Sequence, residues 1–200
     1  MSALPTALRE HIWPALASSD ESKALAKVAA ADWRNFLAHP TEELTPGGQL
    51  VLVIGAVDET CAARLEPMMD LANDILRTLV TEGKLGAQTC AAMTIPSRPR
   101  SREELTGPFD KGDIAELSLE ELVIAETPNA AMLHWRQTGD AAAFASDITG
   151  FFIAAFGPSL FGDDQPLREP FVERFTAAIV HAPDPIARPL VTATLRIARR

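Results

Sequence analysis

The chain has 200 residues, of which 47% are hydrophobic and 22% are charged, a composition typical of a globular chain of one domain or slightly less. Its formal net charge of −9 argues against nucleic acids and anionic membranes as partners. The sequence shows no signal-peptide pattern and no uninterrupted apolar run of membrane-spanning length, which predicts a cytoplasmic protein without membrane contact. Cys61 and Cys90 are expected to be reduced thiols.

The first predicted elements are a helix and a strand. Ser18 and Glu21 have the spacing of a capping box, and apolar residues then recur at helical spacing, which predicts a helix over 18–39 that ends before a proline. The turn Pro46–Gly48 leads into an apolar run that predicts a strand over 49–57, buried on both faces as in a parallel sheet. Such a strand needs further parallel strands beside it. Only a helix and an irregular leader precede it, so we expect the remaining strands to lie upstream of the first residue.

Helical segments and two more strands follow. An apolar stripe over 65–80 is closed by Gly83 at a C-cap position. Ser101 and Glu104 can cap a short helix, and the last strand alternates apolar and polar residues. The predicted elements follow the order helix, strand, helices, strand, helices, strand. Three strands are too few to bury the apolar faces of so many helices. The later helices are predicted at 140–156 and 167–180, and the later strands at 119–126 and 190–198.

The sequence contains no recognisable catalytic motif. It has no Gly-rich phosphate loop, no His-Glu-x-x-His, no Cys-x-x-Cys and no Gly-x-Ser-x-Gly. The four histidines stand far apart, as surface or capping side chains do, and the adjacent acid pairs are typical of solvated charge. The small arginine clusters, such as Arg98, Arg100 and Arg102, are also typical of solvated surface. The residues alone therefore name no mechanism and predict no catalytic or metal-binding residue.

Several short motifs occur in the same order and at similar spacing as in one enzyme family. Together they cover almost the whole chain, which resembles the salicylate/jasmonate/caffeine-type methyltransferases (the SABATH family), in a bacterial form. In that family the first of these motifs end a helix and lead through a glycine turn into the fifth strand of a class I methyltransferase sheet. The motifs are Asp32–Leu37, Glu42–Leu44, Pro46–Gly48, Leu76–Gly83, Ile95–Pro96 and Ala154–Pro158.

The resemblance implies an α/β fold: the C-terminal part of a class I (Rossmann-like) methyltransferase sheet with a helical substrate cap. The final strand is expected to insert antiparallel between the other two strands. The implied divisions are the end of the Rossmann-like core at 1–57, the first part of the cap at 58–116, a sheet strand at 117–127, the second part of the cap at 128–188 and the final strand at 189–200.

The resemblance also implies an activity: S-adenosylmethionine-dependent methyl transfer to a small-molecule carboxylic acid or a similar acceptor. Five positions carry over as substrate-binding, namely Met68, Met69, Arg98, Phe152 and Ala155. Arg98 could hold a carboxylate through a bidentate pair, and a solvent-facing role is an equal alternative. In this family, transfer resembles an in-line displacement that depends on proximity and orientation, and a carboxylate acceptor requires no base.

Two departures from the family pattern limit the activity expected of this chain. Ala91–Thr94 replaces the family's Asp-x-Phe-Asn, so we expect no magnesium site. The cofactor loop, the ribose-binding acid and the substrate-orienting His-Trp are absent, and Met1–Pro5 resembles the residues that directly follow that His-Trp. We therefore expect the chain to be inactive by itself and prone to self-association, unless residues 1–17 cover its open strand edge. The alternative is a non-catalytic module that binds a ligand or a partner.

Overall fold

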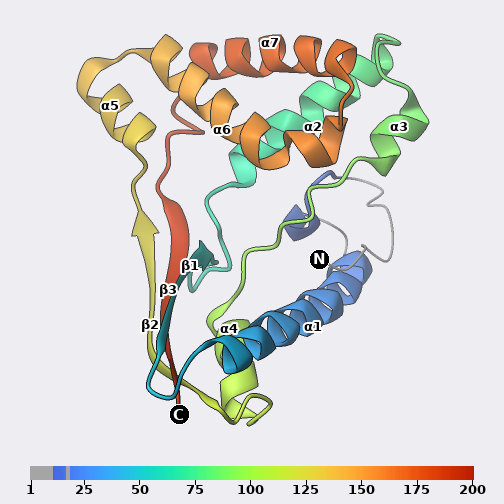
Figure 1. Ribbon diagram of the computed structural model, residues 1–200. Helices are drawn as coiled ribbons and strands as arrows, with labels where there is room; N and C mark the ends of the chain where they lie inside the picture. Colours follow the sequence, from blue (N-terminus) through green and yellow to red (C-terminus); the bar gives the residue numbers. More distant parts are fainter. Residues whose placement is uncertain (1–10, 17–18) are drawn as a thin grey trace.

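The computed structural model describes residues 11–16 and 19–200, with a layer of helices above a sheet (Figure 1). The predicted capping box of Ser18 and Glu21 falls outside the described residues and side chains. The elements are a 3-10 turn η1 (Pro14–Leu16), helices α1 (Ser19–Glu43), α2 (Glu66–Thr81), α3 (Ala87–Ala92), α4 (Arg102–Asp110), α5 (Ala130–Thr138), α6 (Ala141–Phe161) and α7 (Gln165–His181), and strands β1 (Gln49–Gly55), β2 (Leu117–Thr127) and β3 (Leu190–Arg199).

The last strand lies in the middle of the sheet, as predicted. The strand order is β1-β3-β2, and β3 is antiparallel to both neighbours, so β1 and β2 run parallel to each other. Leu195 pairs with Leu52 on one side and Leu122 on the other. Because side chains alternate between the two faces of a sheet, these leucines share one face and the residues next to them point to the opposite face.

Two clusters of buried side chains stabilise the two layers. In the sheet cluster, Trp33 and Leu37 of α1 pack with the inward-facing residues of the strands. The other cluster lies among helices α2, α5, α6 and α7, and we call it the cap cluster. In it, the rings of Phe152, Phe171 and Phe175 lie with centroids 4.8–5.6 Å apart, which is the favourable range for aromatic pairs. Trp13 is fully buried in the cap cluster. The leader segment therefore packs with the cap.

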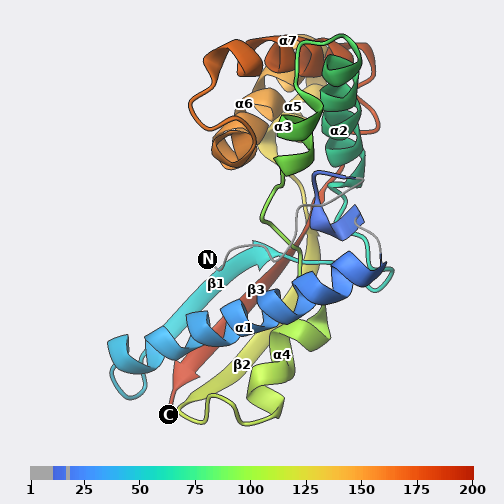
Figure 2. The same ribbon diagram turned by 90° about the vertical axis from the view of Figure 1, so that its right-hand side faces the viewer.

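Among the described residues, no helix covers one face of the sheet and no strand pairs with its outer edges. Helices α1 and α4 cover the other face (Figure 2), whereas Val51, Val53 and Val123 are 62%, 65% and 47% exposed. No strand in the described part of the chain pairs with the outer edge of β1 or of β2. Residues 11–16 pack elsewhere, with Ile12 in the cap cluster, and residues 1–10 are outside the described residues. On this face the valines alternate with polar side chains of β3, among them Thr194 and Arg196. The prediction that β1 is buried on both faces is therefore wrong within the described part of the chain.

Two helices continue through prolines that were predicted to end them. Helix α1 runs through Pro40 to Glu43, and α6 runs through Pro158. Near a helix end, proline removes only one of the helix hydrogen bonds, and the bond from Leu44 N to Pro40 O, 2.9 Å, continues the ladder. The extra turn of α6 buries Phe161 in the cap cluster, which compensates for the lost bond.

Helix α6 is long and apolar enough to cross a membrane by length and composition alone. The sequence still has no uninterrupted apolar run of that length, because Ser146, Asp147 and Thr149 interrupt the apolar residues of α6. Its side chains include Phe144, Ile148 and Phe152 of the cap cluster. A core helix can have the same length and composition, and these buried side chains place one face of α6 in the cap cluster.

Candidate functional site

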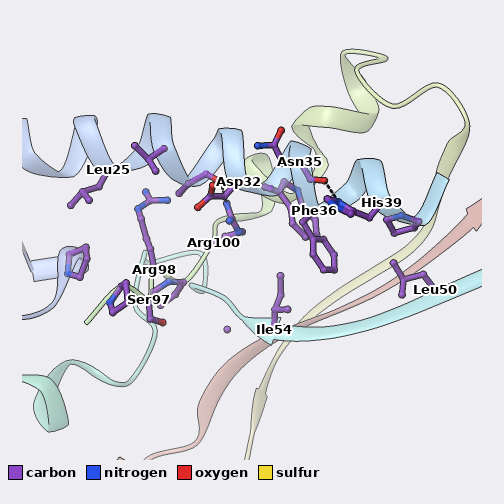
Figure 3. A pocket seen from close by; sticks show the side chains of 18 of the residues that line it. Leu25, Asp32, Asn35, Phe36, His39, Leu50, Ile54, Ser97, Arg98 and Arg100 are labelled. Atoms are coloured by element: carbon purple, nitrogen blue, oxygen red, sulfur yellow. Dashed lines mark hydrogen bonds between the residues drawn. The ribbon is translucent and has the colours of Figure 1, made fainter. Parts of the chain in front are cut away.

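An open groove of about 1090 Å³ lies between α1, β1 and the segment 96–100. Figure 3 shows Leu25 and Phe36 on the α1 side, Leu50 and Ile54 on the β1 side, and Arg98 on the segment. The groove follows the free edge of β1 and reaches its carboxyl end. In open α/β sheets, ligands bind outside the carboxyl ends of the parallel strands, so this groove is the first candidate site.

The position of Arg98 in the groove wall is determined by a helix cap. The side chain of Ser101 accepts a hydrogen bond from Glu104 N (3.3 Å), and Glu104 Oε2 accepts one from Ser101 N (3.0 Å). This is the predicted capping box, formed at the start of α4. The other oxygen of Glu104 pairs with the guanidinium of Arg98, whose side chain is 24% exposed. Arg98 is therefore neither fully solvated nor free of a partner.

Arg100 has a structural role in the same wall. Its Nη1 donates to Ala29 O of α1 at 2.9 Å, and its guanidinium lies 5.3 Å from the centre of the Trp33 ring, within cation–π range. Its backbone forms a parallel bridge with Ala56, directly after β1. Burial is the main cause that lowers the pKa of Arg100 below its ordinary value. The expectation of solvated arginines is therefore wrong for Arg98 and Arg100.

A smaller cavity of about 190 Å³, which we call the cap cavity, lies where the cap meets the first residue of β3. Arg64 lies at the entrance to α2 with a left-handed φ of +68°. No motif or spacing in the sequence singles out this residue. The cap cavity is lined by Arg64, Leu65, Met68, Asn129, Ala131, Asp147, Ile148, Phe151, Ile186, Arg188 and Leu190.

The five predicted substrate-binding residues do not lie together. Arg98 lines the groove and Met68 lines the cap cavity. Met69 and Phe152 are 0% exposed within the cap cluster, and Ala155 is exposed on α6. Two of these residues thus line different cavities, and the other three line neither the groove nor the cap cavity. Their role in substrate binding stays a prediction.

The described residues do not complete a site for S-adenosylmethionine. Gly55–Val57 at the carboxyl end of β1 offers neither a Gly-rich loop nor an acid. The next carboxylate, Asp58, already accepts hydrogen bonds from Thr60, Ala62 and Arg64. These bonds, first among them the one from the Thr60 hydroxyl, lower the pKa of Asp58. Within the same described ranges, no group of three or more His, Cys, Asp or Glu residues is placed to hold a metal ion.

Comparison with known proteins finds similarity among solved structures. No protein-family model and no curated protein matches the chain. A solved structure of loganic acid methyltransferase with SAH is similar, with a TM-score of 0.61 and 18% sequence identity over 96% of this chain. The alignment covers 53% of that chain, so the present chain spans about half the length of the structure it matches. The likeness shows that the chain has an α/β fold shared with part of a methyltransferase.

Proposed function

We propose that this chain forms the acceptor-binding part of an S-adenosylmethionine-dependent methyltransferase for small-molecule carboxylic acids. This proposal rests on the similarity in fold to a methyltransferase whose structure was solved with SAH. The groove at the carboxyl end of β1 supports the proposal, because ligands of open α/β sheets bind at that end. In this proposal the sheet is the end of a class I, Rossmann-like sheet, with β1 as its fifth strand.

Activity in this proposal requires a cofactor-binding part with further strands. Two observations support this requirement. The described residues near β1 lack the groups that hold a nucleoside, and no strand among them pairs with the outer edge of β1 along the groove. A parallel strand added there would extend the sheet. The described chain contributes the helical cap, which can exclude water from an acceptor and orient it.

A non-catalytic ligand-binding module is the second candidate. One observation favours it: the cap cavity is formed entirely by described residues and needs no further strand. In this case the cap would bind a small molecule without any cofactor. The two candidates therefore differ in whether the protein ever binds S-adenosylmethionine.

The DNA directly upstream of the Met1 codon separates the two candidates. A reading frame that continues through His-Trp and an Asp-x-Gly loop supports the enzyme, whereas an in-frame stop supports the module. Calorimetry of the 200-residue chain with S-adenosylmethionine should show no measurable binding, and a micromolar dissociation constant would contradict that expectation. The extended protein should bind the cofactor and transfer its labelled methyl group to a carboxylic acid. An extended protein that folds but does neither would refute the proposal.

A further inference from the structure

We infer that a second copy of this chain pairs with the outer edge of β1, and that the two β1 strands join antiparallel around a two-fold axis at Val51. The inference goes beyond the proposed function, because it concerns the 200-residue chain by itself. In the extended enzyme of that proposal an upstream strand would occupy the same edge. The two arrangements therefore exclude each other and can be told apart.

A hydrogen bond at the end of β1 identifies the backbone groups that point away from the sheet. Gly55 O accepts from Arg100 N at 3.3 Å on the side of β1 opposite β3. Alternate residues of a strand direct their N–H and C=O groups to the same edge, so Gln49, Val51 and Val53 direct theirs outward too. Among residues 11–16 and 19–200, no strand and no other backbone hydrogen bond reaches these three residues from that side. We call them the free edge.

The free edge is short and has definite ends. At its carboxyl end, Val57 N donates to Arg100 O at 3.1 Å, so the segment 96–100 lies along the strand beyond Val53. At its amino end, Gly47 N donates to Arg199 O at 2.9 Å in the turn before β1. The three positions of the free edge are thus centred on Val51, which makes the edge complementary to an antiparallel copy of itself.

Only one antiparallel register uses all three positions. In it Val51 faces Val51 of the second copy and Gln49 faces Val53, and each facing pair exchanges two hydrogen bonds. A shift of two residues would place Gln49 against Gly55 in one direction, or Val53 against Gly47 in the other. Gly55 O and Gly47 N already have partners within the chain. The two-fold register therefore satisfies the free edges of both copies at once.

Apolar side chains face apolar side chains in this register. On the groove side, Leu50 faces Leu52 of the second copy, because residues opposite each other in antiparallel strands share a face. Phe36 points from α1 toward β1 and is 46% exposed (Figure 3). The groove of about 1090 Å³ would join that of the second copy, and the Phe36 side chains would lose contact with water.

The charges near the two-fold axis permit this pairing, and β1 itself is uncharged. Glu43 precedes the amino end of β1, so antiparallel pairing brings it toward the segment 96–100 of the second copy. There Arg98 and Arg100 lie beside Glu104 and Asp32, so Glu43 meets a balanced group of charges. The net charge of −9 on each copy still opposes association at low salt, and screening at about 0.15 M salt reduces this repulsion.

The other edge of the sheet opposes further growth. Glu121 and Glu126 lie on β2, and the register with β3 shifts between Leu119 and Glu121. Charges and irregular register protect an edge strand from pairing. In the dimer, both outer edges of the joined sheet would be β2 strands. Because a two-fold interface uses the same surface on both copies, the product is a closed dimer rather than an open-ended series.

Disulfide cross-linking tests the register in a background of Cys61→Ser and Cys90→Ser. Val51→Cys should form a covalent dimer under oxidising conditions, because facing Cα atoms about 5.5 Å apart lie within the roughly 4.4–6.8 Å that a disulfide spans. Val53→Cys is the matched control, since the two valines are 62% and 65% exposed. The two Val53 positions would lie about 13 Å apart along the strands, so this variant should give little covalent dimer.

Sedimentation velocity of the 200-residue chain over a range of concentrations tests the closed dimer at about 0.15 M salt. Val51→Pro removes only an outward N–H and should raise the dimer dissociation constant about tenfold or more, because two hydrogen bonds across the axis are lost. Val51→Thr keeps this N–H and should dimerise like the wild type. If Val51→Pro fails to fold, the two cysteine variants decide the register by themselves.

Three results would overturn the inference: a monomer at every concentration, an open-ended series of larger species, or cross-linking of Val53→Cys as efficient as that of Val51→Cys. The extended protein with Val51→Cys separates this inference from the proposed function. It should not cross-link, because an upstream strand would cover the free edge. Cross-linking there would support the dimer and contradict the place given to the upstream strand in the proposed function.

Discussion

The indole Nε1 of Trp13 donates a hydrogen bond to the backbone oxygen of Ser97 at 2.9 Å and so joins segments 84 residues apart. The neighbouring residue continues the contact, because Ile95 N donates to Ile12 O at 2.7 Å and Ile12 N donates to Asn73 Oδ1 at 3.3 Å. The leader is thus attached both to α2 and to the segment that lines the groove.

Loss of the Trp13 ring should strongly destabilise the protein. Trp13 is 0% exposed, and deletion of a buried tryptophan side chain costs about 3–5 kcal/mol out of a typical stability of about 5–15 kcal/mol. We expect Trp13→Ala to lower the free energy of unfolding in urea by about that amount. Trp13→Phe keeps most of the ring and should cost less. Equal stability of Trp13→Ala and the wild-type protein would show that the leader does not contribute to the cap core.

His11 should make the protein less stable in mild acid. Its Nδ1 accepts a hydrogen bond from Trp13 N at 3.0 Å, and its Nε2 lies 3.4 Å from Asp70 Oδ1. Burial lowers the pKa of His11 below its ordinary value of 6.5, although Asp70 opposes this effect. The unfolded state then binds the proton more readily, so stability is retained above pH 6.5 and declines as the pH falls below it.

The free energy of unfolding at pH 7.5 and at pH 5.5 checks this expectation. His11→Asn keeps an acceptor for Trp13 N–H and cannot titrate, so it should reduce the difference between the two pH values. His134→Asn, at an exposed position of α5, is the control and should leave the difference as in the wild-type protein. An unchanged difference in His11→Asn would contradict the assignment to His11.

The 200-residue chain should self-associate, aggregate or fold only in part. Each large apolar side chain left in water forfeits about 1.5–3 kcal/mol, and the free edge of β1 carries no charge, proline or bulge to prevent pairing. The outer edge of β2 is protected, because Glu120, Glu121 and Glu126 lie on this strand and its register shifts at Glu120.

Sedimentation velocity combined with a thermal melt measures this association. Val53→Lys should dissociate the oligomers, because it places a charge on the unprotected edge strand. Val123→Lys is the matched control, since Val53 and Val123 flank Thr194 in one row on the same face of the sheet, and it should have little effect. A monodisperse monomer with a sharp cooperative melt would mean that the open edge has no such consequence.

The link between α2 and α7 should weaken below pH 4.5. Arg174 donates to both oxygens of Glu82, at 2.9 and 2.6 Å, and Lys84 Nζ lies 3.0 Å away. The Arg174 bonds first, and then Lys84, lower the pKa of Glu82 from 4.5 to about 2. The stabilising contribution is therefore present above pH 4.5 and is lost as the pH falls toward 2. Thermal melts at pH 5 and pH 3 should show a smaller decrease in Tm for Glu82→Gln than for the wild type or for Glu103→Gln, an exposed control on α4.

Local signals in the sequence determined most of the secondary structure. The Pro-Gly-Gly turn and the apolar run after it predicted β1, although not the exposure of one of its faces. The alternating final segment predicted the strand β3, whereas its place between the other two strands was expected from the family resemblance. Gly83, with φ of +71°, and the Ser101–Glu104 capping box lie where they were expected. These features depend on periodicity and on hydrogen bonds between residues a few positions apart, which a sequence displays directly.

The tertiary structure alone decided where α1 and α6 end and which side chains meet. Burial of Phe161 carries α6 past Pro158, and no local rule reveals that burial. Met68 and Met69 are adjacent, yet only Met68 lines a cavity. Arg64 meets residues more than 80 positions away in the cap cavity because α2, α6 and the segment before β3 pack together. A cavity wall is formed by such long-range packing, so its residues share no spacing from which a sequence could predict them.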